Sequence, residues 1–301
     1  MTRRAESQVI LLVGGDTDPW CAALLDALAG TGRPAVVASN PMADPHRFRW
    51  QFGSGESEWE LELASGPRIT QRDVSAVFVA SPPSFGPEGW QAADLAYVHA
   101  ETWAAFLGWL WSLRCPVVNR SPASVWYRRS TNLLEWSASL WAAGLPMQRA
   151  IVTNVVSEAR VFAGGAGVYN ALGVNASMLI ETEEEWSALA RIMERTHACV
   201  TRPHGEATFA CVVGGDIVWS ARPPGARRLE PALLAFARST GLAWVEVVFA
   251  ETDARLEVIA VEPFPVPWHF TEPQAERIVA SLCAMFSAPA QDRHLAELVP
   301  S

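Results

Sequence analysis

Lysine is absent from this chain of 301 residues, so all 23 of its basic residues are arginines. A mechanism that needs a lysine amine is therefore excluded. The formal net charge is −9, which disfavours a general role in binding nucleic acids or anionic membranes. Among side chains that are always charged at pH 7, only arginine remains to contact a phosphate group, and it binds phosphate through a planar fork rather than a point charge.

Cysteines are few, and no two have the CxxC spacing. Their odd number, five, favours free buried thiols in a reducing cytoplasm. Long apolar runs are also missing. The segment at the N-terminus is too short for an export signal, and the most apolar helical stretch, 92–113, contains Asp94, His99 and Glu101. We therefore expect a core helix rather than a membrane span, and a cytoplasmic protein.

The usual sequence signatures of several chemistries do not occur. GxSxG, HExxH and P-loop motifs are absent, and Gly14-Gly15 does not complete a GxGxxG fingerprint. A zinc set built from His197, Cys199 and His204 or Cys211 is conceivable, but its spacing fits no finger or ribbon pattern. Buried thiols and a hydrogen-bonded histidine are the simpler interpretation.

Half of the residues are apolar and fourteen are tryptophan, which is ample for a sizeable core. In the first part of the chain, apolar runs alternate with helical patterns in the manner of an α/β layer, with a hairpin-like insertion at 48–63 that has one buried face. The expected elements of this layer are strand 8–13, helix 20–28, strand 35–38, strand 73–80, helix 92–113 and strand 115–119.

The second part of the chain mixes helices with short strands. Gly214-Gly215 predicts the tight turn of a hairpin, and Gly144-Leu145-Pro146 is typical of a helix end. The other expected elements are helix 130–143, strand 150–153, helix 181–193 and helix 230–239.

Two acidic residues interrupt apolar strands near the end of the chain. The runs 242–249 and 255–261 are joined by a short polar turn and predict an antiparallel hairpin. Pairing of these strands would bring Glu246 and Glu262 onto one face. Buried carboxylates need a partner or a cation, and Mg²⁺ prefers oxygen ligands. The alternative is that both glutamates lie at strand ends and are solvated.

The order of these elements, with an E-x-x-P…W pattern after the hairpin, resembles the ATP-grasp ligases over about 73–286. The closest variety is the microviridin type of peptide-modifying carboxylate–amine ligase. The resemblance implies an α/β and α+β protein, with an ATP-grasp-like fold and an N-terminal α/β preceding domain. It also implies a strand at 199–203 and a closing helix at 271–286. We expect the preceding domain at 1–121, a first ATP-grasp-like subdomain at 122–200 and a C-terminal subdomain at 201–301.

The resemblance also implies a site for ATP and Mg²⁺, with Glu246 and Glu262 as the metal ligands. The family has lysines where this chain has Arg128 or Arg129, which we expect to contact phosphate, and Asn170. The positions expected to contact the nucleotide are Arg128, Arg129, Asn170 and, on the ribose, Glu206. Further departures replace the phosphate-facing arginine of the family by Phe209 and its metal-binding asparagine by Phe264.

Arg222, Arg227 and Arg228 form the strongest positive cluster of this acidic protein. By resemblance, the cluster and His269 lie where substrate binds, and the arginines would receive an acidic peptide or a carboxylate. The alternative is that the arginines are solvated.

Two hypotheses of function remain open. The favoured one is a degenerate ATP-grasp-like protein that binds a peptide or a small anionic ligand in the ancestral cleft without normal ATP turnover. The alternative is an ATP- and Mg²⁺-dependent carboxylate–amine ligase that works through an acyl phosphate. The sequence identifies no catalytic residue, and it leaves a homodimer or a partner protein open.

Overall fold

The computed structural model describes residues 8–15, 17–43, 46–53, 56–64, 66–81, 89–120, 132–172, 177–252 and 255–287. The chain forms two compact units. The first combines residues 1–127, 241–244 and 271–301, and the second combines 128–240 and 245–270. The predicted end of the preceding domain at Ser121 lies outside the described residues.

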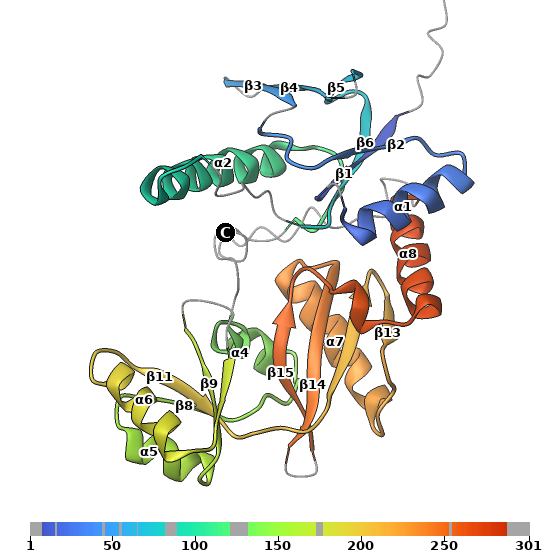
Figure 1. Cartoon of the computed structure of the whole chain (residues 1–301). Helices are drawn as coiled ribbons and strands as arrows, with labels where there is room; N and C mark the ends of the chain where they lie inside the picture. Colours follow the sequence, from blue (N-terminus) through green and yellow to red (C-terminus); the bar gives the residue numbers. More distant parts are fainter. Residues whose placement is uncertain are drawn as a thin grey trace, which may run out of the picture. The chain divides into compact units, whose positions relative to one another are not determined.

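The first unit contains the parallel sheet expected from the N-terminal pattern (Figure 1). Its strand order is β2-β1-β6-β7, with β1 flanked by parallel partners on both edges. Because such a central strand is covered on both faces, its sequence is almost entirely apolar. The strands are β1 (Val9–Val13), β2 (Ala35–Ala38), β6 (Val74–Val79) and β7 (Val117–Val118).

Helices α1 (Pro19–Gly30) and α8 (Glu272–Ser287) pack against each other in this unit, although they lie at opposite ends of the sequence. Asp18 caps α1 by accepting hydrogen bonds from the backbone N–H groups of Trp20 and Cys21. The last helix of the described residues therefore belongs to the unit built by the first strands.

The predicted aromatic insertion forms an antiparallel sheet, whose strands are β3 (Arg47–Gly53), β4 (Glu56–Glu62) and β5 (Arg68–Thr70). Phe48 and Trp59 both meet Trp109 of α2 (Ala92–Ser112) edge to face, so one face of the insertion is buried as predicted. In the described part of the chain, no helix has the length and apolar content to span a membrane.

The second unit holds two four-stranded sheets (Figure 1). The first has the order β10-β9-β11-β8, and α5 (Val156–Ala163) and α6 (Glu183–Met193) contribute to its apolar core. Thr182 caps α6 in a reciprocal capping box with Glu185. The strands are β8 (Ala150–Thr153), β9 (Gly167–Asn170), β10 (Ser177–Ile180) and β11 (Ala198–Thr201).

The second sheet has the order β13-β12-β14-β15. Its first hairpin turns at Gly214, whose φ of 59° lies in the left-handed region that glycine tolerates best. Helices α4 (Leu133–Ala142) and α7 (Ala226–Thr240) pack together, with Trp136 against Phe236. The strands are β12 (Ala207–Val213), β13 (Asp216–Trp219), β14 (Trp244–Thr252) and β15 (Arg255–Glu262).

One predicted boundary is wrong. Helix α7 begins at Ala226 and not at Glu230, so Arg227 and Arg228 lie in its first turn rather than in a loop. Pro231 suggests a start nearby because proline is common in the first turn of a helix. Here the helix extends five residues before the proline. Elements α5, β5 and β10 have no counterpart among the predicted elements.

Candidate functional site

The two glutamates singled out in the sequence lie opposite each other in the second unit. Glu246 of β14 is the direct cross-strand partner of Glu262 of β15, so the prediction that pairing places them on one face is confirmed. Their surroundings differ. The side chain of Glu246 is completely buried, whereas that of Glu262 is only partly buried.

The carboxyl group of Glu246 is held by its own chain. Oε1 lies 2.9 Å from Nδ1 of His269, and Oε2 accepts a hydrogen bond of 3.3 Å from the backbone N–H of Val266. Burial raises the pKa of Glu246 to about 8; the Val266 hydrogen bond opposes this effect, and the nearby Glu262 adds to it. Burial also lowers the pKa of His269. Both shifts favour the uncharged forms, and hence a neutral hydrogen bond over an ion pair.

The aromatic ring of Phe209 packs against the imidazole of His269. The imidazole belongs to a short 3₁₀ turn at Pro267–His269, and the ring of Phe209 stacks on it with 3.7 Å between the centroids. The next residue back, Trp268, is 80% exposed. Phe209, His269 and Glu246 thus form a contiguous set of contacts that encloses the carboxyl group of Glu246.

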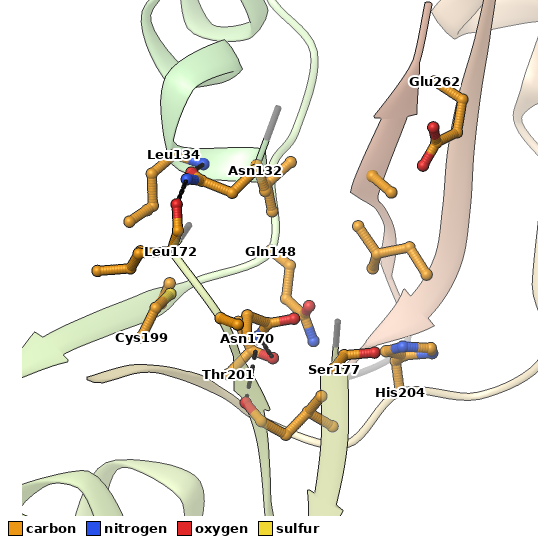
Figure 2. Close-up of a pocket in the computed structure, with 16 residues that line it drawn as sticks. Asn132, Leu134, Gln148, Asn170, Leu172, Ser177, Cys199, Thr201, His204 and Glu262 are labelled. Atoms are coloured by element: carbon orange, nitrogen blue, oxygen red, sulfur yellow. Dashed lines mark hydrogen bonds between the residues drawn. The ribbon is translucent and has the colours of Figure 1, made fainter. Parts of the chain in front are cut away.

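A cavity of about 160 Å³ opens beside the second glutamate (Figure 2). Strands β8, β9, β10 and β11 and the start of α4 contribute to its wall, together with the end of β15. Its polar side chains are mainly uncharged amides and hydroxyls. The lining residues that carry polar side chains are Asn132, Gln148, Asn170, Ser177, Cys199, Thr201, His204 and Glu262.

Hydrogen bonds orient the amides of this cavity. Asn170 donates through Nδ2 to the carbonyl oxygen of Val168 and to Oγ1 of Thr201, both at 3.2 Å. Gln148 donates through Nε2 to the carbonyl oxygen of Arg202 at 2.8 Å. Because each amide nitrogen faces a carbonyl oxygen, the orientation of both groups is determined.

Other residues selected from the sequence lie at different places. Glu206 is exposed just before β12 and does not line the cavity. Arg222, Arg227 and Arg228 are exposed around the start of α7, and Arg222 forms a salt bridge with Glu230. Arg128 and Arg129 lie outside the described residues.

The described residues of this region fit Mg²⁺ and a triphosphate poorly. Glu246 uses both carboxyl oxygens in contacts with its own chain. The described residues that line the cavity include no arginine. Across the described part of the chain, no three His, Cys, Asp or Glu side chains are placed to hold a metal ion together. A triphosphate and its metal ions need fixed charges, which these neutral amides do not supply.

Sequence reasoning missed most of the residues that line the cavity, among them Gln148, Ser177 and Thr201. One signal was present: alternate residues of a strand share a face, so Thr201 had to accompany Cys199 on β11. Gln148 precedes β8 in a segment whose pairing with β15, at Met147 and Val258, is evident only in three dimensions.

Comparison with known proteins identifies the architecture. No protein-family model and no curated protein sequence matches the chain. Among solved structures, a RiPP-associated ATP-grasp ligase from Chryseobacterium gregarium, in complex with ADP and a leader and core peptide, is similar. Its TM-score is 0.73 at 16% identity, over 95% of this chain and 99% of that chain.

Two further solved structures have the same architecture. The macrocyclase MdnC from Microcystis aeruginosa MRC, bound with precursor peptide MdnA, has a TM-score of 0.70 at 16% identity, over 91% of this chain and 99% of that one. The ATP-grasp ligase PsnB, complexed with a variant of its minimal precursor, Mg and ADP, has a TM-score of 0.69 at 16% identity, over 93% and 99% of the two chains. The chain therefore has the ATP-grasp fold, as the order of its sequence elements predicts.

Proposed function

We infer that this chain is a degenerate ATP-grasp-like protein that binds a peptide or a small anionic ligand without normal ATP turnover. The enclosed carboxyl group of Glu246 carries this proposal. Its two oxygens contact His269 and Val266, and its side chain is fully buried. A buried carboxyl group whose oxygens are both used in contacts with its own chain is a poor ligand for a hard cation.

The chemistry of the neighbouring cavity supports the same function. The chain has no lysine anywhere, and Asn170, which lines the cavity, is a neutral amide at the position where the family resemblance implies a phosphate-binding lysine. Removing one preorganised donor from a catalytic site can cost about 10²–10³ in rate. Several such losses together leave little of the ordinary mechanism, although their effects do not simply multiply.

Peptide binding is supported by the similar structures, which hold a leader and core peptide in one case and a precursor peptide in others. On this chain, the exposed Arg222, Arg227 and Arg228 give an acidic peptide a place to bind. The peptide would remain chemically unchanged because no acyl phosphate is formed.

A second candidate function is an ATP- and Mg²⁺-dependent carboxylate–amine ligase. It is favoured by the direct pairing of Glu246 with Glu262 and by the Mg and ADP of the similar PsnB structure. For this function, His269 would have to release Glu246, so that both carboxylates face a metal ion.

Thermal unfolding with and without Mg-ATP separates the two candidates. A nucleotide present at 100 times its Kd stabilises a folded protein by about 2.7 kcal/mol. We expect no shift for the wild-type chain with ATP and Mg²⁺ in the millimolar range, and no release of ADP in the presence of an acidic peptide. An ATP-dependent shift accompanied by ADP release would contradict the proposal.

A gain-of-charge variant provides the matched control. Asn170→Lys supplies a cation at one of the positions that depart from the family pattern, and it leaves the stack of Phe209 on His269 in place. If missing charge is the reason for weak nucleotide binding, this variant should bind Mg-ATP more tightly than the wild-type chain. Equal and measurable ATP binding by both proteins would remove the physical basis of the proposal.

A further inference from the structure

One long face of helix α2, in the first unit, is both apolar and exposed. The exposed residues of this face are Tyr97, Ala100, Ala104 and Trp111. Their spacings of three, four and seven residues are those that place side chains on one face of a helix. Tyr97 is 67% exposed and Trp111 is 47% exposed. The opposite face carries Trp109, which packs against the aromatic insertion, so α2 lies beside β3 and β4 and leaves this face uncovered (Figure 1).

The charged side chains of α2 avoid this face. Asp94 and Glu101 are the only Asp, Glu, Lys or Arg residues of the helix. At about 100° of rotation per residue, both lie roughly 70–90° around the helix from the centre of the face. Contiguous apolar patches of a few hundred Å² on a soluble protein mark interaction sites, so the face favours a macromolecular partner.

The size of the face fits a weak complex. From Tyr97 to Trp111 the helix rises about 21 Å, and a helix with its side chains is about 10 Å wide. Phe52 widens the apolar strip, because it is 73% exposed and packs against Trp50, whose ring lies next to Gly108 of α2. Interfaces below about 1,200 Å² in total are typical of weak complexes, so we expect a Kd in the micromolar range.

The order of residues along the face matches a second, antiparallel copy of the same helix. A twofold axis at Ala104 places residues equally far before and after it at the same height on the two helices. Tyr97 precedes Ala104 by seven residues and Trp111 follows it by seven. Tyr97 of each copy would therefore meet Trp111 of the other, and the small side chains of Ala100 and Ala104 between these pairs allow the helices to approach closely.

Charge complementarity selects the same arrangement. Asp94 precedes Ala104 by ten residues, and Arg114, just after the end of α2, follows it by ten. Both side chains are exposed. The twofold axis brings Asp94 of each copy to the level of Arg114 of the other, which forms two pairs of opposite charge. A parallel pair of helices would instead place like charges together at both ends, and like charges across an interface repel.

We propose that the exposed face of α2 binds the same face of a second copy of this chain, antiparallel, with Asp94 and Arg114 paired at both ends. The face shares no residue with the cavity or with the contacts of Glu246. The inference therefore goes beyond the proposed function and does not depend on whether ATP is turned over.

Sedimentation velocity across the micromolar range tests the inference, and we expect a monomer that becomes a dimer as the concentration rises. Asp94→Arg alone and Arg114→Asp alone each place like charges together at both ends, so each should weaken the dimer roughly 10-fold or more. The two substitutions combined restore opposite charges and should return the affinity to near the wild-type value. Ala104→Glu puts a charge at the centre of the face and should abolish the dimer.

Controls separate self-association from folding. Glu184→Arg reverses an exposed acid in the first turn of α6 and should keep wild-type self-association. Tyr97→Ala should weaken the dimer. At submicromolar concentration, where the wild-type chain is monomeric, urea unfolding of Tyr97→Ala and of the charge variants should show that each of them is folded.

A wild-type chain that stays monomeric throughout the micromolar range overturns the inference. A dimer that persists in Ala104→Glu also overturns it, because the copies then meet through another surface. Failure of the combined charge reversal to restore the dimer overturns the antiparallel arrangement. None of these measurements uses nucleotide, so their outcome leaves the test of the proposed function with Mg-ATP unaffected.

Discussion

The ring of Phe209 lies flat against the imidazole of His269, with 3.7 Å between the centroids and 14° between the planes. The imidazole in turn lies against the buried carboxyl group of Glu246. Phe209 of β12 therefore positions the carboxyl group of Glu246 on β14 through His269, which lies outside the sheet. This arrangement links three positions that the sequence connects only through a family resemblance.

Phe209→Ala should destabilise the chain by about 1–3 kcal/mol, because it removes a stacked aromatic pair and leaves space beside His269. Urea unfolding followed by tryptophan fluorescence measures the change. Tyr97→Ala is the control, since Tyr97 is 67% exposed and should change stability by no more than about 0.5 kcal/mol. Equal effects of both substitutions would show that the stack contributes nothing.

The raised pKa of Glu246 predicts that the free energy of unfolding falls as the pH rises. Its pKa is about 8 in the folded chain and near 4.5 when unfolded, so the folded state binds the proton more tightly, and stability is lost progressively between these values. His269 opposes this slope below pH 6.5, because its lowered pKa makes the folded state bind fewer protons than the unfolded state. Between pH 6.5 and 8, the slope of the free energy of unfolding against pH therefore reports on Glu246.

The measurement is the free energy of unfolding of the metal-free protein across that range. Glu246→Gln should flatten the slope and give the more stable protein at pH 8, by an amount on the order of a few kcal/mol. Glu184→Gln changes an exposed residue of α6 and should keep the wild-type slope. If the Glu246→Gln variant keeps the wild-type slope of unfolding free energy against pH, another titratable group causes the slope.

The arginine cluster predicts salt-dependent binding of acidic peptides. Arg227→Ala with Arg228→Ala should weaken binding of a hexaglutamate peptide several-fold at low salt, and added salt should weaken wild-type binding. Glu230→Gln releases Arg222 from its salt bridge and should strengthen binding. The control is Arg191→Ala with Arg195→Ala on and just after α6. If the Arg227/Arg228 variant binds hexaglutamate with wild-type affinity, the prediction is wrong and the arginine cluster is only a solvated surface.

A substitution at Gly14 tests the packing at the end of β1 in the parallel sheet. A Cβ atom at this position would lie 2.7 Å from Sγ of Cys21 and 3.1 Å from Cβ of Ala80. Gly14→Ala should therefore cost about 1–3 kcal/mol through overpacking. Gly15→Ala is the adjacent control, because its Cβ would meet no atom within 4 Å. Thermal unfolding compares the two variants, and a larger loss for Gly15→Ala would contradict the packing described here.

The sequence by itself determined most of the order of elements, the parallel sheet, the hairpins β12–β13 and β14–β15 and the shared face of Glu246 and Glu262. It missed α5, β5 and β10, and with β10 the antiparallel pair that β9 and β10 form. The features that it determined follow from local rules: apolar periodicity sets helices and strands, glycine sets tight turns, and the two-residue repeat of a strand sets faces. The resemblance to ATP-grasp ligases rests on that order, and the similar structures confirm the fold.

Only the tertiary structure decided which groups meet. The contact of His269 with Glu246, the stacking of Phe209 and the cavity lined by Gln148 and Thr201 join residues that are far apart in the chain. The burial that raises the pKa of Glu246 likewise comes from packing around β14. Such contacts depend on how whole elements pack, and local periodicity carries no information about that.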